Sequence, residues 1–348
     1  MTFLVKELIE RFGELIESTR NDENVEFMTI DSVCQSNSGS LVFVGDKAQV
    51  PSKAPAVMVT TNDLAGQLTE LNCCVIAVKN VRLAQAKIKQ AYQDYDSSDP
   101  EWQQIHGSAV IHNSASLGDG VRVGPNAVIG ANVQIGAGSQ IRANAVIEHD
   151  AVLGQDCIIS PFVNIGYGCR LGNRVNLHTG VVIGNEGFGF AQDSDRDYHR
   201  IPHTGIVEIG NDVQIGANSN IDRGTYNSTV IGDGVKLDSL CHVAHNVHID
   251  QGTLFASQAC IAGSTYIGKR VTASGQVGVL DHLSIADNTV LVHRSGVTEN
   301  IAEPGMYGGV PAKPFKEYVR MIGASKRIDK LNLQIKELKK QLKEKLLS

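Results

Sequence analysis

Three histidines lie within seven residues in the segment CHVAHNVHID, at His242, His245 and His248. An imidazole has a pKa near neutrality, so it can act as a general base, and it is also a common metal ligand. Which chemistry this segment supports depends on where the fold places each ring. The elements that carry the three side chains therefore have to be established first.

Composition narrows the class of protein. The chain has 348 residues and a formal net charge of -6, which argues against a nucleic-acid-binding surface. Its seven cysteines are an odd number without a CxxC pair, which is typical of reduced thiols in the cytoplasm. The first eighteen residues, MTFLVKELIERFGELIES, lack the continuous apolar core of a secretory signal. No segment has the roughly 18 apolar residues of a transmembrane helix, so we expect a soluble cytoplasmic protein.

A six-residue repeat organises the middle of the chain. The repeat is interrupted at NEGFGFAQDSDRDYHRIPHTG and again at DRGTYNST. An apolar residue, aliphatic except for Phe255, recurs at every sixth position, at 111, 117, 123, 129, 135, 141, 147, 153, 159, 165, 171, 177 and 183, then at 209, 215 and 221, and then at 231, 237, 243, 249, 255, 261, 267, 273, 279, 285, 291 and 297.

This period fits neither an α-helix nor a long strand. It predicts short strands, each followed by a turn that contains Gly or Asn. In each strand two side chains point inward, that of the aliphatic residue and that of the residue two before it. Three such segments close a triangular coil of eighteen residues, and nine or ten coils stack into a prism with a spacing of about 4.8 Å. Cys157, Cys169 and Cys241 fall at inward positions, so we expect them to be core residues.

The flanks of the repeat have different patterns. Residues 1–104 predict a small α/β domain, with strand-like runs at 41–45, 56–61 and 73–79 and a helical segment at 81–95. We expect the stacked coils to span residues 105–312 and a helical extension to span residues 313–348.

That extension has coiled-coil spacing at Leu331, Ile335, Leu338 and Leu342. Between 313 and 345 it carries eleven Lys or Arg against four acids. Such a segment is either a solvated basic helix or a docking surface for an acidic partner.

The repeat also places the three histidines. His242 and His248 each precede an inward residue, so both point outward and on different faces of the prism. His245 lies in a turn between them. The three rings cannot converge on one ion within a subunit, so we predict no metal site.

A corner of the prism collects other groups. Gly263 lies eighteen residues after His245, one coil away on the same edge, and His282 lies about two coils away. The two histidine backbones are then about 10 Å apart, with the Gly263 N–H between them. A base, an oxyanion donor and a second imidazole on one ridge suit acyl transfer. Two surface histidines on turns are the alternative interpretation.

Several motifs carry a resemblance to a known family. VVIGNEGFGFA, HRIPHTGIVEIG, ANSNIDRGT, VAHNV, ACIAGS and GQVGVLDHLSI occur in this order behind DSVCQSNSGSLVFV and VIAVKNVRLAQAKI. Together they resemble the UDP-3-O-acylglucosamine N-acyltransferases of lipid A biosynthesis over nearly the whole chain. The resemblance implies a mostly β fold, a left-handed parallel β-helix with a small N-terminal α/β domain and C-terminal helices.

The resemblance also implies the reaction. Family members are homotrimers that transfer a 3-hydroxyacyl chain to the 2-amine of a UDP-3-O-acyl-glucosamine. The donor is the 4'-phosphopantetheine arm of acyl carrier protein, and no bound cofactor or metal is needed. By match, His245 is the general base, the Gly263 N–H holds the oxyanion, and His282 assists at the oxyanion or leaving group. Asp238 matches an acid that orients the base.

The substrate-binding residues come from the same resemblance. Carrier proteins are acidic, so we expect the basic C-terminal helices, with Arg294, to form a docking surface for acyl carrier protein. Gly296 stands where relatives can carry a bulky residue, so we expect a groove open to longer acyl chains. In the N-terminal domain Phe43 matches an aromatic that stacks on uracil, while Asp46 replaces Asn and Gln49 replaces the second aromatic. Stacking is worth about 1–3 kcal/mol per base, so we expect weaker or rearranged uridine binding.

Other functions are compatible with a six-residue repeat. Another nucleotide-amino-sugar acyltransferase of this fold, with a coenzyme A donor, would carry a Gly-rich first loop in its N-terminal domain, and the chain has no GxGxxG. The O-acyltransferase that precedes in the same pathway lacks an N-terminal domain of this kind. A non-catalytic scaffold would show rows of one residue type on a face. A carbonic anhydrase would need histidines that converge across a subunit interface.

Overall fold

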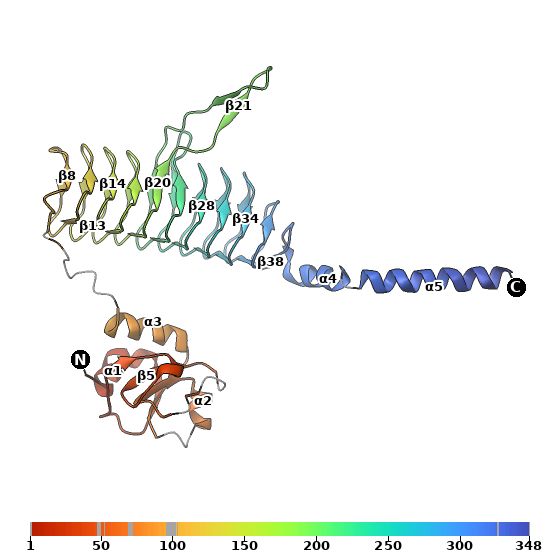
Figure 1. Cartoon of the computed structure of the whole chain (residues 1–348), viewed down its shortest axis with the longest axis horizontal. Helices are drawn as coiled ribbons and strands as arrows, with labels where there is room; N and C mark the ends of the chain where they lie inside the picture. Colours follow the sequence, from red (N-terminus) through yellow and green to blue (C-terminus); the bar gives the residue numbers. More distant parts are fainter. Residues whose placement is uncertain are drawn as a thin grey trace. The chain divides into compact units, whose positions relative to one another are not determined.

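The computed structural model describes residues 2–46, 50–51, 53–68, 72–94, 102, 104–325 and 327–347. The chain forms two compact units, Met1–Asp99 and Pro100–Ser348. Each unit has its own buried apolar core, and the two are described separately (Figure 1).

The N-terminal unit is built around a five-stranded sheet in the order β2-β7-β6-β5-β4. Strand β2 is antiparallel to β7, and the other neighbours are parallel. The two central strands are buried along their whole length, as expected for a sheet covered on both faces. This confirms the predicted α/β fold. Its elements are β1 (Phe3–Leu4), α1 (Val5–Phe12), η1 (Gly13–Leu15), β2 (Ile16–Arg20), β3 (Glu26–Phe27), β4 (Thr29–Ile30), η2 (Val33–Gln35), β5 (Ser40–Val44), β6 (Val57–Thr60), α2 (Asn62–Gln67), β7 (Cys74–Val78) and α3 (Val81–Tyr92).

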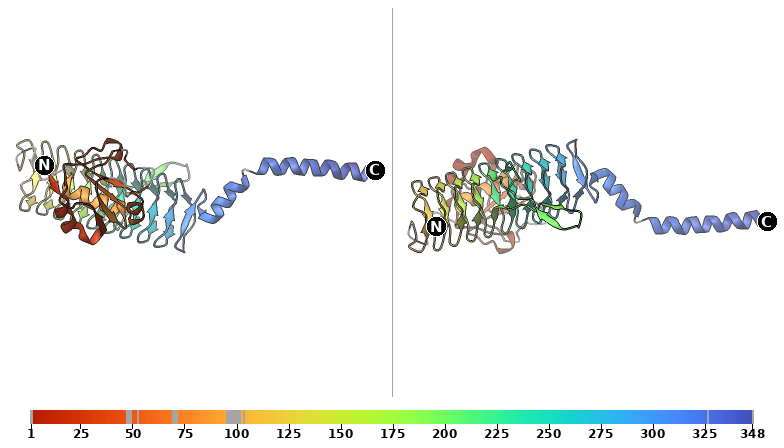
Figure 2. Two further views of the ribbon diagram at one scale, coloured as in Figure 1. Left: turned by 90° about the horizontal axis from the view of Figure 1, so that it is seen from below. Right: turned by 90° about the horizontal axis from the view of Figure 1, so that it is seen from above.

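The second unit is a left-handed β-helix with three sheets of parallel strands, and its stacked coils are visible in both views of Figure 2. The first sheet contains β10 (Arg122–Val123), β13 (Gln140–Ile141), β16 (Ile158–Ile159), β19 (Asn176–Leu177), β24 (Gln214–Ile215), β27 (Lys236–Leu237), β30 (Leu254–Phe255), β33 (Thr272–Ala273), β36 (Val290–Leu291), β38 (Met306–Gly308) and the antiparallel β39 (Lys313–Pro314). The second contains β8 (Val110–Ile111), β11 (Val128–Ile129), β14 (Val146–Ile147), β17 (Asn164–Ile165), β20 (Val182–Asn185), β25 (Asn220–Asp222), β28 (His242–Val243), β31 (Cys260–Ile261), β34 (Gly278–Val279) and β37 (Gly296–Val297). The third contains β9 (Ser116–Leu117), β12 (Gln134–Ile135), β15 (Val152–Leu153), β18 (Arg170–Leu171), β23 (Val207–Ile209), β26 (Thr229–Ile231), β29 (His248–Ile249), β32 (Tyr266–Ile267) and β35 (Ser284–Ile285).

The register of these sheets confirms the predicted eighteen-residue coil. His242 pairs with Cys260, for example, and Cys260 pairs with Gly278. The aliphatic position of each repeat and the position two before it fill one continuous core. Cys157, Cys169 and Cys241 are buried in it, as predicted.

The turns explain why Gly and Asn recur. The third residue after most of the aliphatic positions adopts a left-handed backbone, for example Asn126 at φ 57°, Asn132 at φ 58° and Gly138 at φ 74°. Gly and Asn adopt this conformation at low cost. His282 occupies the same turn position with φ 57°.

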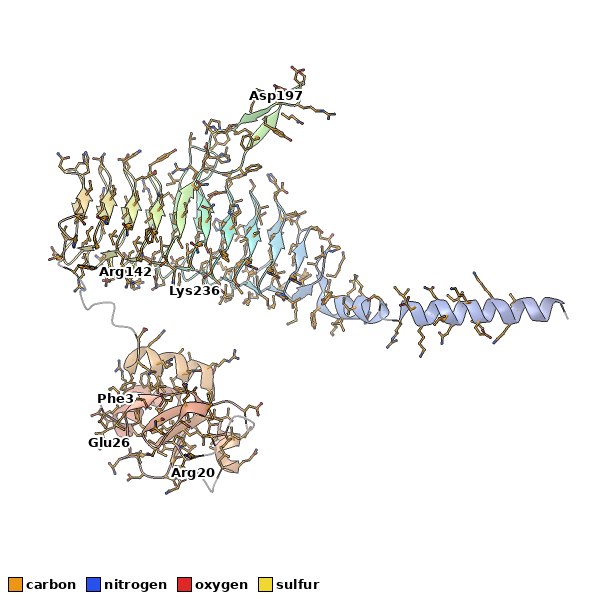
Figure 3. All side chains as sticks on the ribbon, viewed as in Figure 1. Phe3, Arg20, Glu26, Arg142, Asp197 and Lys236 are labelled. Atoms are coloured by element: carbon orange, nitrogen blue, oxygen red, sulfur yellow. The ribbon has the colours of Figure 1, made fainter. Side chains whose placement is uncertain are left out.

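Two insertions interrupt the stack where the sequence predicts breaks. At the first, Arg170 pairs with Glu208 rather than with a residue eighteen positions on. The intervening segment forms a hairpin of β21 (Phe190–Gln192) and β22 (Tyr198–Arg200) that projects from the prism, with Asp197 near its tip (Figures 1 and 3). The second is the short loop between β25 and β26.

The C-terminal segment is helical, as predicted. It consists of α4 (Phe315–Ser325) and α5 (Ile328–Leu347). The four apolar residues with coiled-coil spacing are exposed along α5, and these are Leu331, Ile335, Leu338 and Leu342. Among the described residues, no helix is long and apolar enough to cross a membrane.

Candidate active site

His245 lies at the corner between β28 and β29, on the same ridge as Gly263 and His282. The Ser264 N–H donates a 3.0 Å hydrogen bond to the His245 carbonyl, and the His282 N–H donates a 3.0 Å bond to the Gly263 carbonyl. Successive coils are thus joined at this corner. The predicted stacking of the three residues is confirmed.

Gly263 is required by the His245 ring, which packs directly against it. A Cβ added at Gly263 would lie 2.7 Å from His245 Cε1 and 2.9 Å from Nε2. Any side chain would displace the ring. The Gly263 N–H donates no hydrogen bond within the part of the chain that the structure describes, so it is available to a ligand carbonyl.

An elongated cavity of about 570 Å³ begins at His245 and follows the edge of the second sheet. Its floor is a column of outward positions that pair from coil to coil, His242, Cys260, Gly278 and Gly296. The small residues at its far end leave space above the sheet, and Val310 covers Gly296, where an added Cβ would lie 3.1 Å from Val310 Cγ1. A polar end with histidines followed by an apolar groove suits a substrate with a reactive head and an acyl tail.

Asp222 is a buried acid at the polar end of this cavity. Its side chain is 4% exposed, it accepts a 2.5 Å hydrogen bond from Asn220 Nδ2, and its Oδ2 lies 3.6 Å from His242 Nε2. Burial raises the pKa of Asp222, and the Asn220 hydrogen bond opposes this shift. Asp222 was not predicted as a site residue, because the motif IDRGT that contains it lies where the six-residue period breaks.

Burial lowers the pKa of His245, and nearby His203 acts in the same direction, while Asp222 opposes both. A base must be neutral to accept a proton, so the lowered pKa keeps His245 in its working form at neutral pH. We expect Asp222→Asn to lower the pKa of His245 further, because it removes a negative charge that favours the imidazolium. The measurement is an NMR titration of the His245 Cε1 proton.

The matched control for this titration is Asp238→Asn, which should leave the midpoint of His245 unchanged. A midpoint above 6.5 in the wild-type protein, or one that rises in Asp222→Asn, would contradict the electrostatic account.

Asp238 lies away from His245 within one chain, so its expected role of orienting the base stays a prediction. It follows β27, one corner earlier than His245, and its Oδ1 accepts the Ser239 N–H at 2.7 Å. Asp222 is the carboxylate whose charge raises the pKa of His245.

Two other predicted residues lie outside the cavity. Arg294 lies at the same corner of the prism as Asp238, where its Nε donates a hydrogen bond to Gln276 Oε1 at 2.7 Å. His282 is 75% exposed and does not line the cavity.

The remaining predictions are the uridine-binding residues of the N-terminal unit and the absence of a metal site. Phe43 is partly buried against that unit's core, and Asp46 is exposed after β5. Gln49 lies outside the described residues, so the prediction about uridine stands untested. His242 and His248 lie on different sheets, as predicted. Among the described residues, no three His, Cys, Asp or Glu side chains gather as a metal site.

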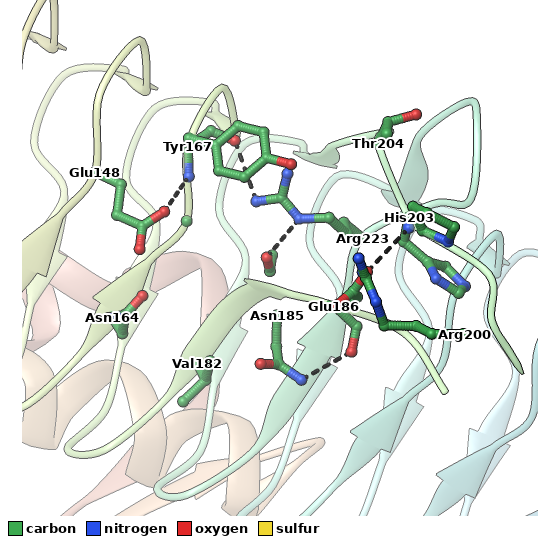
Figure 4. A pocket seen from close by; sticks show the side chains of 13 residues that line it. Glu148, Asn164, Tyr167, Val182, Asn185, Glu186, Arg200, His203, Thr204 and Arg223 are labelled. Carbon is green, nitrogen blue, oxygen red and sulfur yellow. Dashed lines mark hydrogen bonds and ion pairs between the residues drawn. The ribbon is translucent and has the colours of Figure 1, made fainter. Parts of the chain in front are cut away.

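A second cavity, of about 610 Å³, adjoins the base of the hairpin (Figure 4). Arg223 of IDRGT is buried there, with its guanidinium 3.5 Å from the centre of the Tyr167 ring and hydrogen bonds to the carbonyls of Gly184, Gly205 and Tyr167. These carbonyls and the ring stabilise the buried charge, so Arg223 holds the hairpin base on the β-helix.

Comparisons with known proteins agree with this arrangement. A family model described as the GMPPB C-terminal domain matches residues 105–186. A UDP-3-O-acylglucosamine N-acyltransferase of Methylococcus capsulatus (Bath) is 45% identical over 347 residues, 98% of each chain. A probable mitochondrial UDP-3-O-acylglucosamine N-acyltransferase 2 of Arabidopsis thaliana is 45% identical over 154 residues, 44% of this chain and 51% of its own. A solved Arabidopsis UDP-N-acetylglucosamine acyltransferase has a TM-score of 0.53 and 25% identity, covering 60% of this chain and 73% of that one.

The fold, the histidine corner and the apolar groove define an acyltransferase of the left-handed β-helix class. The Methylococcus relative matches over 98% of both chains, which also shows the family. The chain belongs to the UDP-3-O-acylglucosamine N-acyltransferase family.

Proposed function

We propose that this acyltransferase moves a 3-hydroxyacyl chain from acyl carrier protein to the 2-amine of a UDP-3-O-acyl-glucosamine, in lipid A synthesis. One observation carries the proposal, the packing of His245 against Gly263 at the mouth of the apolar groove. A base and a free N–H lie side by side there, and the groove extends away from both. The names of the relatives supply the amino-sugar acceptor.

The transfer needs no covalent enzyme intermediate. The acceptor amine attacks the thioester carbonyl, and its proton passes to the neutral Nε2 of His245. The developing oxyanion accepts a hydrogen bond from the Gly263 N–H. The C–S bond then breaks, the amide forms, and the proton on His245 passes to the departing thiolate. His282, which lies on the same ridge but faces solvent, would assist at the oxyanion or the leaving group.

The C-terminal helices support the proposed partners. Acyl carrier proteins are acidic, and residues 313–345 carry an excess of Lys and Arg. The exposed apolar stripe of α5 needs a partner to bury it, and identical helices of a homotrimer would provide one. The proposed enzyme binds no cofactor of its own, and its cytoplasmic location stays a prediction.

The test is an assay of the full chain with UDP-3-O-acyl-glucosamine and 3-hydroxyacyl carrier proteins of graded chain length. N-acylated product is expected with a carrier-protein donor. Product with the coenzyme A thioester alone would overturn the donor assignment. Product only with a different nucleotide amino sugar would favour another acyltransferase of this fold.

Gly296→Met is expected to shift the donor preference toward shorter acyl chains. Val310 already covers this position, so a longer side chain has to enter the groove. Each methylene that no longer fits loses about 0.8 kcal/mol of burial, about a fourfold fall in kcat/KM. The measurement is kcat/KM against donor chain length. Gly275→Met, outside the groove lining, is the control, and an unchanged profile for Gly296→Met would argue against a groove that ends here.

A further inference from the structure

Two buried nitrogens beside the groove have no hydrogen-bond partner. Among the described residues, His203 Nε2 and His245 Nδ1 are the buried side-chain nitrogen and oxygen atoms left unpaired. The two rings are neighbours, with centroids 4.9 Å apart and planes inclined by 60°. A buried polar atom without a partner is costly, so two of them side by side need an explanation.

The tautomer of His203 is set by its surroundings. Its Nδ1 lies 2.9 Å from the Ile201 carbonyl oxygen, which can only accept, so Nδ1 carries the hydrogen. The ring is 3% exposed, and with the hydrogen on Nδ1 the other nitrogen of a neutral imidazole can only accept. Nε2 of His203 is therefore a hydrogen-bond acceptor beside His245.

His245 needs an acceptor of this kind. If its Nε2 is to take a proton from the substrate amine, Nδ1 must carry the hydrogen, and this N–H is buried. We propose that His203 is a positioning residue that accepts the His245 Nδ1–H, thereby fixing the ring as the tautomer that can act as a base. This inference rests on the proposed function. Catalytic hydrogen bonds are often long without substrate and tighten to about 3 Å in the complex.

The hairpin base holds His203 against His245. Glu186 accepts the His203 backbone N–H at 3.2 Å and pairs with Arg200 (Figure 4). The two glycines of NEGFG make room for the rings. A Cβ at Gly187 would lie 2.8 Å from His203 Nε2 and 2.9 Å from His245 Cβ, and one at Gly189 would lie 2.6 Å from His203 Cε1.

The decisive measurement is the ¹⁵N spectrum of the His245 imidazole in the intact protein at pH 8, assigned by comparison with His245→Ala. The Nδ1–H tautomer is expected in the wild type. His203→Phe, which fills the space but cannot accept, should make it the minor form and lower kcat at least about tenfold, with KM for the acceptor within about twofold. His203→Gln keeps an acceptor oxygen and should retain the tautomer and most of the activity. His112→Phe, on a distant coil, is the control.

Each outcome decides the proposal. An Nε2–H tautomer in the wild-type protein overturns it, even if His203→Phe does not fold. A His203→Phe protein that folds and keeps both tautomer and kcat also overturns it. Activity that survives in His245→Ala refutes the proposed general base instead, since the tautomer is measured without turnover.

Discussion

His245→Ala is expected to lower kcat/KM by about 10³-fold while the protein stays folded. General-base catalysis is typically worth 10²–10⁴-fold, and Nε2 of His245 lies over the Gly263 backbone at the mouth of the groove. Its ring contacts Gly263 and His203 and lies outside the apolar core of the β-helix, so thermal unfolding should change little. Acyl transfer and the unfolding midpoint are measured on the same preparation.

His248→Ala is the matched control for this loss. His248 belongs to the same segment but lies on another sheet, where it stacks on Tyr266 with ring centroids 5.1 Å apart. Its variant should keep activity within about twofold. Equal losses in both variants would mean that His245 acts through the fold rather than as a base.

Gly263→Ala is expected to lower kcat by about 10²-fold. The added Cβ would lie 2.7 Å from the His245 ring, so the ring has to move by a large part of an ångström. Misplacement of a catalytic group by about 1 Å can cost 10²-fold in rate. The backbone N–H remains, so the loss reports the position of the base. A crystal structure of the variant, with its kcat, is the measurement.

Gly275→Ala provides the comparison for the glycine substitution. Its added Cβ would meet the Ser257 carbonyl oxygen at 3.3 Å and His293 Nδ1 at 3.8 Å, away from the groove. Activity should be close to that of the wild type. If Gly263→Ala is equally active, the close packing of ring and glycine is not needed for the reaction.

The six-residue period predicted the coil, the inward residues and the corner shared by His245, Gly263 and His282, because a stacked repeat converts sequence distance directly into position. The role of Asp238 came from the resemblance and stays a prediction. The same arithmetic places it on the preceding corner.

Asp222 and His203 could not be placed from the period, because both lie where it breaks. An insertion has no fixed register, so its side chains are positioned by tertiary contacts such as the Arg223 hydrogen bonds to Gly184 and Tyr167. A usable signal did exist at the hairpin. Two glycines flanking a phenylalanine in NEGFG, followed by His203, indicate a backbone that packs closely on a ring.

The eighteen-residue coil also bears on how this fold can change over time. Each coil pairs only with its two neighbours, as His242 does with Asn220 and Cys260. A duplication or loss of one whole coil far from the site would therefore lengthen or shorten the prism while leaving every contact around His245 in place. A gain or loss of six or twelve residues within the stack would rotate the downstream corners by one or two faces of the prism, whereas an insertion of another length has to loop out, as the hairpin of β21 and β22 does. The number of coils can therefore change during evolution, whereas the position of each corner within the eighteen-residue coil cannot.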